Sequence, residues 1–249
     1  MIRGALLLAA LLTAAPAAAR DHGLHAEWSA APRLVPKGGG RGPTTYAQRG
    51  LDAATITVLP PEGAPRTLGA GAPVAFEGIG NYHLVTARSQ SDGVVRTAMT
   101  ARYFSEPGPA PQDLLAAKRP GFEIVPHPLP REHAHFEAGR TWAFRLRLDG
   151  QPMAGLGVTL ETANGSRVVA VSDAEGLARL TFPADFTPGP GRRNAAFVVS
   201  ASVEGHLSAY NDSYVPSPMD NRSLPMGAAF LVAGMAAAVP FLRRKGATP

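Results

Sequence analysis

A two-residue alternation of apolar and polar side chains, broken at regular intervals by turn sequences, constrains the fold of this chain most. Between residues 141 and 148 every second side chain is Trp, Phe or Leu, which indicates a strand with one buried face. Arg145 and Arg147 occupy the other face, and we predict that they point into water. Turn sequences such as Asn164-Gly165 separate further alternating segments. The strands expected in this half lie at residues 122–125, 141–148, 156–160, 168–172, 178–182, 197–203 and 207–215.

Seven short strands at this spacing are typical of an immunoglobulin-like β-sandwich, which we predict for residues 121–215. The 27 glycines and 24 prolines among the 249 residues argue against a helix bundle, because both residue types interrupt helices. The chain contains no cysteine. Disulfides, cysteine-based zinc sites, iron–sulfur clusters and thiol nucleophiles are therefore excluded. The predicted fold class is all-β.

A smaller β-rich module is expected before the sandwich, over residues 20–105. Asp92-Gly93 predicts a hairpin turn between its last two strands, and the glycine-rich segment 36–45 predicts a loop. Residues 106–120 contain four prolines and are interpreted as a linker with a short helix at 112–118. The strands expected upstream of this linker lie near residues 26–34, 55–59, 74–76, 82–87 and 94–103.

The first 19 residues have the pattern of a secretory signal peptide. A basic start at Arg3 is followed by an apolar run that is too short to cross a bilayer, and then by three alanines at 17–19. We expect cleavage after Ala19.

The other end of the chain predicts a membrane anchor. Residues 224–242 contain no charged side chain and are followed directly by Arg243, Arg244 and Lys245. A helix of this length just crosses a bilayer, and the positive-inside rule keeps the tail 243–249 cytoplasmic. Residues 216–223 would then form a juxtamembrane linker, and the body would lie in the periplasm at the cell inner membrane. A buried C-terminal helix and a removable sorting tail are the alternatives.

The charge distribution excludes nucleic acid as a partner. The formal net charge is +5, but residues 20–242 hold 20 basic and 19 acidic side chains, so the excess belongs to the ends. The sequence contains no G-x-S-x-G elbow, P-loop, dinucleotide-binding glycine fingerprint or H-E-x-x-H motif. We therefore predict that the protein is not an enzyme.

Two glycine motifs carry a family resemblance over residues 121–183. Gly150-Gln-Pro152-Met-Ala-Gly155 precedes the strand expected at 156–160, and Asp173-Ala-Glu-Gly176 precedes the strand expected at 178–182. This order resembles a family of exported proteins with a domain of unknown function (DUF4198), often described as the periplasmic component of cobalt or nickel uptake systems. The same succession of G-x-P-x-x-G and D-x-x-G motifs occurs in carboxypeptidase-regulatory-like and transthyretin-like sandwiches. The resemblance implies a β-sandwich and a role beside a metal transporter.

Two pairs of histidines are the candidate metal ligands. His133 and His135 would project from one face of an extended segment, and such a pair can bind nickel, cobalt, copper or zinc. His22 and His25 lie close to the predicted mature N-terminus, where the family resemblance implies histidine. A copper site with an N-terminal histidine is not expected, because cleavage after Ala19 leaves Arg20 first. The alternatives are exposed loop residues for the first pair and a terminal tail for the second.

Two functions are consistent with these observations. The first is a membrane-anchored periplasmic accessory or binding component of a nickel or cobalt uptake transporter, with the transporter's membrane subunits as partners and a divalent transition metal as ligand. The alternative is a structural or adhesion-type β-sandwich module, which binds a protein or glycan through loops or a sheet edge without metal.

Overall fold

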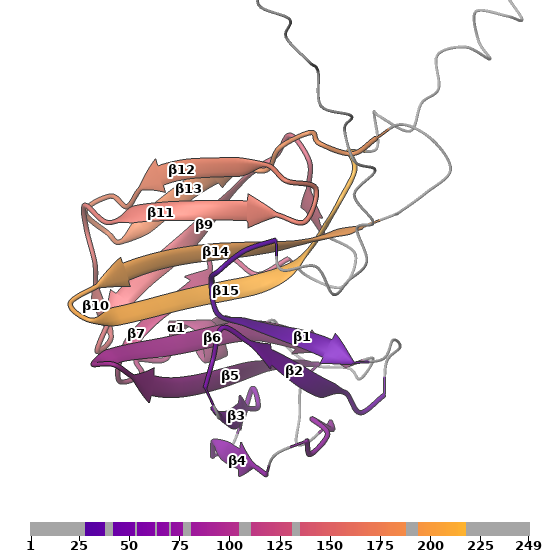
Figure 1. Cartoon of the computed structure of the whole chain (residues 1–249), viewed down its shortest axis with the longest axis vertical. Coiled ribbons are helices and arrows are strands. Elements are labelled where there is room, and N and C mark those ends of the chain that lie inside the picture. Colours follow the sequence, from indigo (N-terminus) through magenta and orange to yellow (C-terminus); the bar gives the residue numbers. More distant parts are fainter. Residues whose placement is uncertain are drawn as a thin grey trace, which may run out of the picture.

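The computed structural model of the chain is built almost entirely from β-strands, which confirms the predicted all-β class (Figure 1). Within the described residues, no helix is long and apolar enough to span a membrane. The predicted signal peptide (1–19), anchor (224–242) and tail (243–249) lie outside them. The structure describes residues 28–37, 42–52, 54–62, 64–69, 71–76, 81–104, 111–130, 135–187 and 194–217.

The C-terminal half is a β-sandwich of three strands against four. All seven strands expected from the alternation are present, and they pair with one another in antiparallel fashion. This layout is that of an immunoglobulin-like sandwich. The first sheet contains β7 (Phe122–Pro126), β9 (Thr141–Leu148) and β13 (Leu177–Thr181), with the short β10 (Gln151–Pro152) also paired to β9. The second sheet contains, in spatial order, β12 (Arg167–Val171), β11 (Gly157–Thr162), β14 (Ala195–Val203) and β15 (His206–Val215).

The second sheet continues without a break into the N-terminal half. β15 pairs in parallel with β6, with His206 opposite Val95 and Tyr210 opposite Met99. The resulting sheet runs from β12 to β4, so it includes strands from both sides of the segment expected as a linker. Its further strands are β6 (Val94–Tyr103), β5 (Tyr82–Ser91), β3 (Thr55–Leu59), β4 (Arg66–Leu68) and the short β8 (Phe136–Glu137), which pairs with the end of β15.

The remaining two strands, β1 (Arg33–Lys37) and β2 (Thr45–Arg49), pair with each other and lie in front of β5 and β6 (Figure 1). β1 begins later than the strand expected at 26–34, and β2 begins at the end of the segment expected as a loop. The segment before β1 instead crosses the outer face of the sandwich, where Ala31 packs against Val198 and Ala209. Long-range packing therefore decides the structure of this region.

Two turns confirm the conformations that their sequences predicted. Asp92 and Gly93 both adopt positive φ angles, 51° and 74°, as a two-residue hairpin turn requires. In the D-x-x-G turn the Asp173 carboxylate accepts hydrogen bonds from the backbone N–H groups of Glu175 and Leu177. Gly176 has a φ of +72°, and a Cβ there would lie 2.7 Å from the carbonyl oxygen of Leu146. Only glycine fits that position.

Candidate functional site

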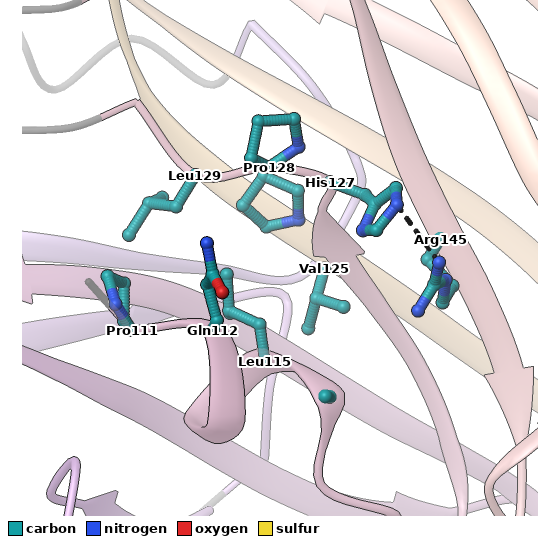
Figure 2. Close-up of a pocket in the computed structure, with 10 residues that line it drawn as sticks. Pro111, Gln112, Leu115, Val125, His127, Pro128, Leu129 and Arg145 are labelled. Carbon is teal, nitrogen blue, oxygen red and sulfur yellow. Dashed lines mark hydrogen bonds between the residues drawn. The ribbon is translucent and has the colours of Figure 1, made fainter. Parts of the chain in front are cut away.

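A cavity of about 380 Å³ lies on the outer face of the sheet that contains β7, β9 and β13, beside the short helix α1 (Gln112–Ala116) (Figure 2). α1 falls within the helix expected at 112–118. The other wall is the turn that follows β7. The ten lining residues are mostly apolar, and none is acidic: Pro111, Gln112, Leu115, Ala116, Val125, Pro126, His127, Pro128, Leu129 and Arg145.

The register of β7 and β9 explains why these residues meet. Val125 lies opposite Arg145, and Glu123 lies opposite Arg147. The residues between them in sequence, Ile124 and Leu146, are fully buried members of the aromatic core. Side chains alternate along a strand, so the two pairs Val125–Arg145 and Glu123–Arg147 share the outer face of the sheet. The helix α1 covers this face. The prediction that Arg147 faces water is therefore wrong, because Arg147 is 4% exposed. Arg145 is half-buried, so it reaches water only in part.

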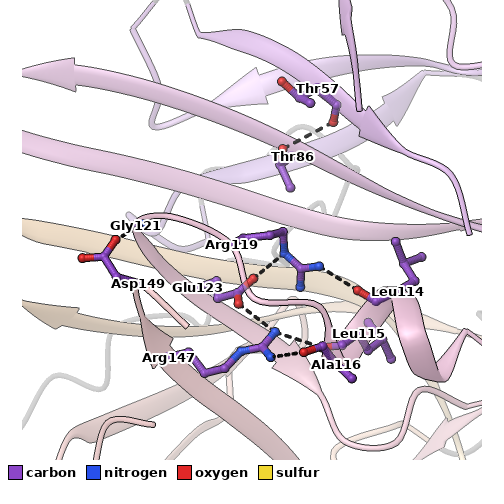
Figure 3. A network of polar contacts seen from close by, with 10 residues as sticks. All are labelled: Thr57, Thr86, Leu114, Leu115, Ala116, Arg119, Gly121, Glu123, Arg147 and Asp149. Atoms are coloured by element: carbon purple, nitrogen blue, oxygen red, sulfur yellow. Dashed lines mark hydrogen bonds and ion pairs between the residues drawn. The ribbon is translucent and has the colours of Figure 1, made fainter. Parts of the chain in front are cut away.

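A buried polar network fixes α1 to this face (Figure 3). Glu123 forms ion pairs with Arg119 at 2.6 Å and with Arg147 at 2.7 Å. The same two guanidinium groups donate hydrogen bonds to the carbonyl oxygens of Leu114, Leu115 and Ala116. The last carbonyl oxygens of a helix have no N–H donor in a following turn, and here the arginines supply the donors. Their positive charge also interacts favourably with the negative end of the helix dipole. The network therefore gives the cavity one rigid wall.

The polar side chains that line the cavity are His127, Arg145 and Gln112, and the first two contact each other. Arg145 Nη2 lies 3.0 Å from His127 Nε2. A guanidinium can only donate, so His127 must accept on Nε2 and is a neutral imidazole in this arrangement. Burial, reinforced by the positive charges of Arg145 and Arg147, lowers the pKa of His127. The rim thus carries the positive charge of Arg145, and in the part of the chain that the structure describes no carboxylate pairs with that charge.

The predicted metal ligands are only partly described. His135 is exposed and directly precedes β8. His22, His25 and His133 lie outside the described residues. Among the residues that are described, no group of three or more His, Cys, Asp or Glu side chains is placed to hold a metal ion. Metal binding by the two histidine pairs stays a prediction.

A second candidate site is the free edge of the long sheet. β12 is the last strand at one end, and the outward-facing Val169 and Val171 are 62% and 64% exposed. Val171 lies opposite Gly157 in the register, and a Cβ at Gly157 would meet nothing within 4 Å. An open apolar strip therefore runs along this edge. Figure 1 shows β12 at the end of the sheet far from β1 and β2.

Sequence reasoning missed the cavity and found the edge only in general terms. The cavity depends on α1 folding back over β7 and β9, which no local pattern indicates. One signal was available, because β9 places two arginines on the face opposite its apolar residues, close to the single carboxylate of β7. Paired strands with opposite charges on a shared face can indicate a covered polar network.

Comparisons with known proteins yield only structural likenesses. No family model and no curated protein matches this chain. One similar solved structure is a two-domain fibronectin type III segment from chicken tenascin, with 9% identity over 74% of this chain and 98% of that chain and a TM-score of 0.23. Another is a tetra-tandem repeat from the extending region of a large adhesion protein. It has 12% identity over 74% of this chain and 47% of that chain, with a TM-score of 0.23.

A third is a Ca²⁺-stabilised adhesin with which an Antarctic bacterium binds ice. It has 12% identity over 75% of this chain and 49% of that chain, with a TM-score of 0.25. The alignments span about half the length of the two adhesion proteins. The assignment of an all-β sandwich to this chain rests on its own sheet topology.

Proposed function

We propose that this chain is a non-enzymatic, adhesion-type β-sandwich module that binds a protein partner by adding one of the partner's strands to β12. The observation that carries the proposal is the exposed apolar edge formed by Val169 and Val171. An edge strand presents unpaired backbone N–H and C=O groups, which an extended segment of another protein can satisfy. Alternate side chains of the added strand would then lie beside the two valines.

The two ends of the long sheet differ in how they discourage such pairing. β4 has only three residues, follows Pro65 and begins with Arg66. Short strands, prolines and charges are the usual protection of a free edge. β12 has five residues of sequence RVVAV, with a charge only at its first position and no proline. The edge at β12 therefore lacks the protection that the edge at β4 has.

The rest of the outer face near β12 is already covered. The segment before β1 packs Ala31 and Trp28 against Val198 and Ala209 over β14 and β15. The Ser29 hydroxyl donates a hydrogen bond to Glu161 on β11. Among the described residues this cover reaches β11 and leaves Val169 and Val171 of β12 exposed, so these two valines are the surface proposed for a partner. The predicted anchor at 224–242 would hold the module at the periplasmic side of the inner membrane.

Site-specific photo-crosslinking tests this function. A photoreactive residue at position 169 or 171 should give one discrete adduct in intact membranes, whereas one at Val168 or Ala170, whose side chains pack against the core, should not. Thr67 on β4 is the matched control on the other edge. With the probe at 169, Val171→Lys should abolish the adduct, because a charge on an edge opposes strand addition.

The mass of the adduct identifies the partner as a second copy or another protein. Adducts of equal yield at 169 and at Thr67, or an adduct that survives Val171→Lys, would contradict the proposal.

A further inference from the structure

We infer that the cavity beside α1 binds an amphipathic carboxylate, whose apolar body fills the cavity and whose charge pairs with Arg145. This site is separate from the proposed edge at β12, because it lies on the outer face of the other sheet of the sandwich. The inference is independent of the proposed function. It rests on the shape, lining and charge of the cavity.

The size and lining of the cavity suit the apolar part of a small ligand. A volume of about 380 Å³ falls within the range of about 300 to 1,000 Å³ that is usual for small-molecule sites. Leu115 and Leu129 are buried in the walls, and Val125 forms the floor. Three proline rings complete the wall, as Figure 2 shows for Pro111 and Pro128. Rigid rings, and a helix whose carbonyl oxygens accept hydrogen bonds from Arg119 and Arg147, keep such a cavity open without a ligand.

The charge around the cavity selects an anion. The outer face of β7 and β9, with the segment leading into it, carries Arg119, Arg145 and Arg147 against the single carboxylate of Glu123. Arg119 and Arg147 share that carboxylate, whereas the side-chain partner of Arg145 among the described residues is the imidazole of His127. A guanidinium has five N–H donors and matches a carboxylate in geometry. Arg145 can therefore donate to a carboxylate without breaking the network that holds α1.

His127 adds selectivity for a negatively charged group. Its neutral ring accepts from Arg145 through Nε2, which leaves an Nδ1–H donor at the rim. Lining by Arg145 and His127 without any acidic residue disfavours cationic ligands and gives a neutral amide no charge to pair with. The chemical class is thus a monocarboxylate on an aliphatic or aromatic body, either a free acid or the C-terminus of an apolar peptide.

Calorimetric titration of the full-length protein with octanoate, octanamide and inorganic phosphate tests the inference. Octanoate should bind saturably and about tenfold or more tighter than octanamide, because a charge-assisted hydrogen bond contributes more than a neutral one. Arg145→Gln should weaken octanoate binding about tenfold and leave octanamide unchanged. Arg167→Gln removes the same charge from exposed β12 and is the matched control, with no expected effect.

A second variant keeps the test valid should Arg145→Gln disturb the fold. Ala116 is exposed at the mouth, so Ala116→Met should fill part of the cavity, weaken octanoate and octanamide alike, and leave stability unchanged. A tripeptide that ends in a free leucine carboxylate distinguishes the source: tighter binding than octanoate assigns the site to a chain terminus, and weaker binding assigns it to a free acid. Phosphate binding as tight as octanoate, equal effects of Arg145→Gln and Arg167→Gln, or no saturable binding in the millimolar range would overturn the inference.

Discussion

The two faces of the strands β5 and β6 contribute to hydrophobic cores of very different size. On one face, Leu84 and Met99 join an aromatic core that contains 24 buried residues among those described. On the other face, Val85 and Ala98 join a core of nine buried residues beneath β1 and β2. Burial of apolar area supplies most of the stability of a fold, so the larger core dominates. The smaller core depends on a sheet that the larger core already holds in place.

The aromatic core also differs from the smaller one in the contacts that its side chains make. The ring centroid of Phe197 lies 4.8 Å from that of Phe182 and 4.9 Å from that of Phe136, and both pairs are edge to face. Tyr210 and Tyr214 extend the cluster. Such pairs add stability beyond area burial. In the smaller core, aliphatic side chains and alanines predominate, and these allow closer backbone approach but less buried area.

Truncation of one buried side chain in each core should show this difference. Phe197→Ala should lower the free energy of unfolding by about 3–5 kcal/mol, because a large cavity would remain among the packed rings. Leu34→Ala removes a fully buried residue of the smaller core and should cost about 2–3 kcal/mol, near the low end for such a change. Urea denaturation of both variants measures the two values. A larger loss for Leu34→Ala would show that the smaller core is not the subordinate one.

The two halves were also unequally predictable from sequence. The sandwich strands alternate regularly because each has one face in the aromatic core, and all seven were predicted. β3 and β6 were predicted with the bounds that the structure shows. β2 was missed because its partner β1 lies across an intervening glycine-rich segment and only Tyr46 is buried. The parallel pairing of β6 with β15 joins residues more than 100 positions apart, and local patterns carry no information about such contacts.

The link between the smaller core and the sandwich provides a test of smaller expected effect. Asn211 on β15 accepts a hydrogen bond from the backbone N–H of Leu34 and donates one to its carbonyl, both at 2.9 Å. Asn211→Ala should cost about 1–3 kcal/mol, because it leaves both buried backbone groups without partners. Amide hydrogen exchange should accelerate in β1 and β2 and stay unchanged in β9 and β13. Ser202→Ala, an exposed position on β14, is the control.

Uniform acceleration across β1, β2, β9 and β13 would mean that Asn211 stabilises the whole fold and that the two cores unfold together. Protection of β9 and β13 at the level of the parent protein would instead make the β1–β2 hairpin a separate unit of local unfolding.

The candidate site was less predictable than the fold. Val169 and Val171 belong to a strand that the alternation predicted, so a sheet edge could be expected but not which edge would be free. The cavity required knowledge of where α1 packs. Arg147 was expected in water because it alternates with core residues, but the helix carbonyls and Glu123 replace that water. Alternation shows which face a side chain occupies, whereas only tertiary structure shows what covers that face.

The smallest expected effect concerns Asp212, which lies where β15 leaves β6 and approaches β8. Burial raises the pKa of Asp212 to about 6, although hydrogen bonds from the Ser213 N–H and the Tyr210 hydroxyl oppose the rise. The folded state therefore holds this proton more tightly than the unfolded state does. The contribution of Asp212 to stability is most favourable below the ordinary carboxyl pKa and is lost as the pH rises through about 6.

Asp212→Asn should remove this pH dependence. Relative to the parent protein, the variant should gain stability between pH 4 and 7, by an amount of the order of 1–2 kcal/mol. Tyr210→Phe deletes the hydroxyl donor that favours the charged form, so it should move the loss of stability to higher pH. Thermal denaturation at a series of pH values measures all three profiles. Parallel profiles for the parent and Asp212→Asn would show that Asp212 is solvated and that the residues around it do not exclude water.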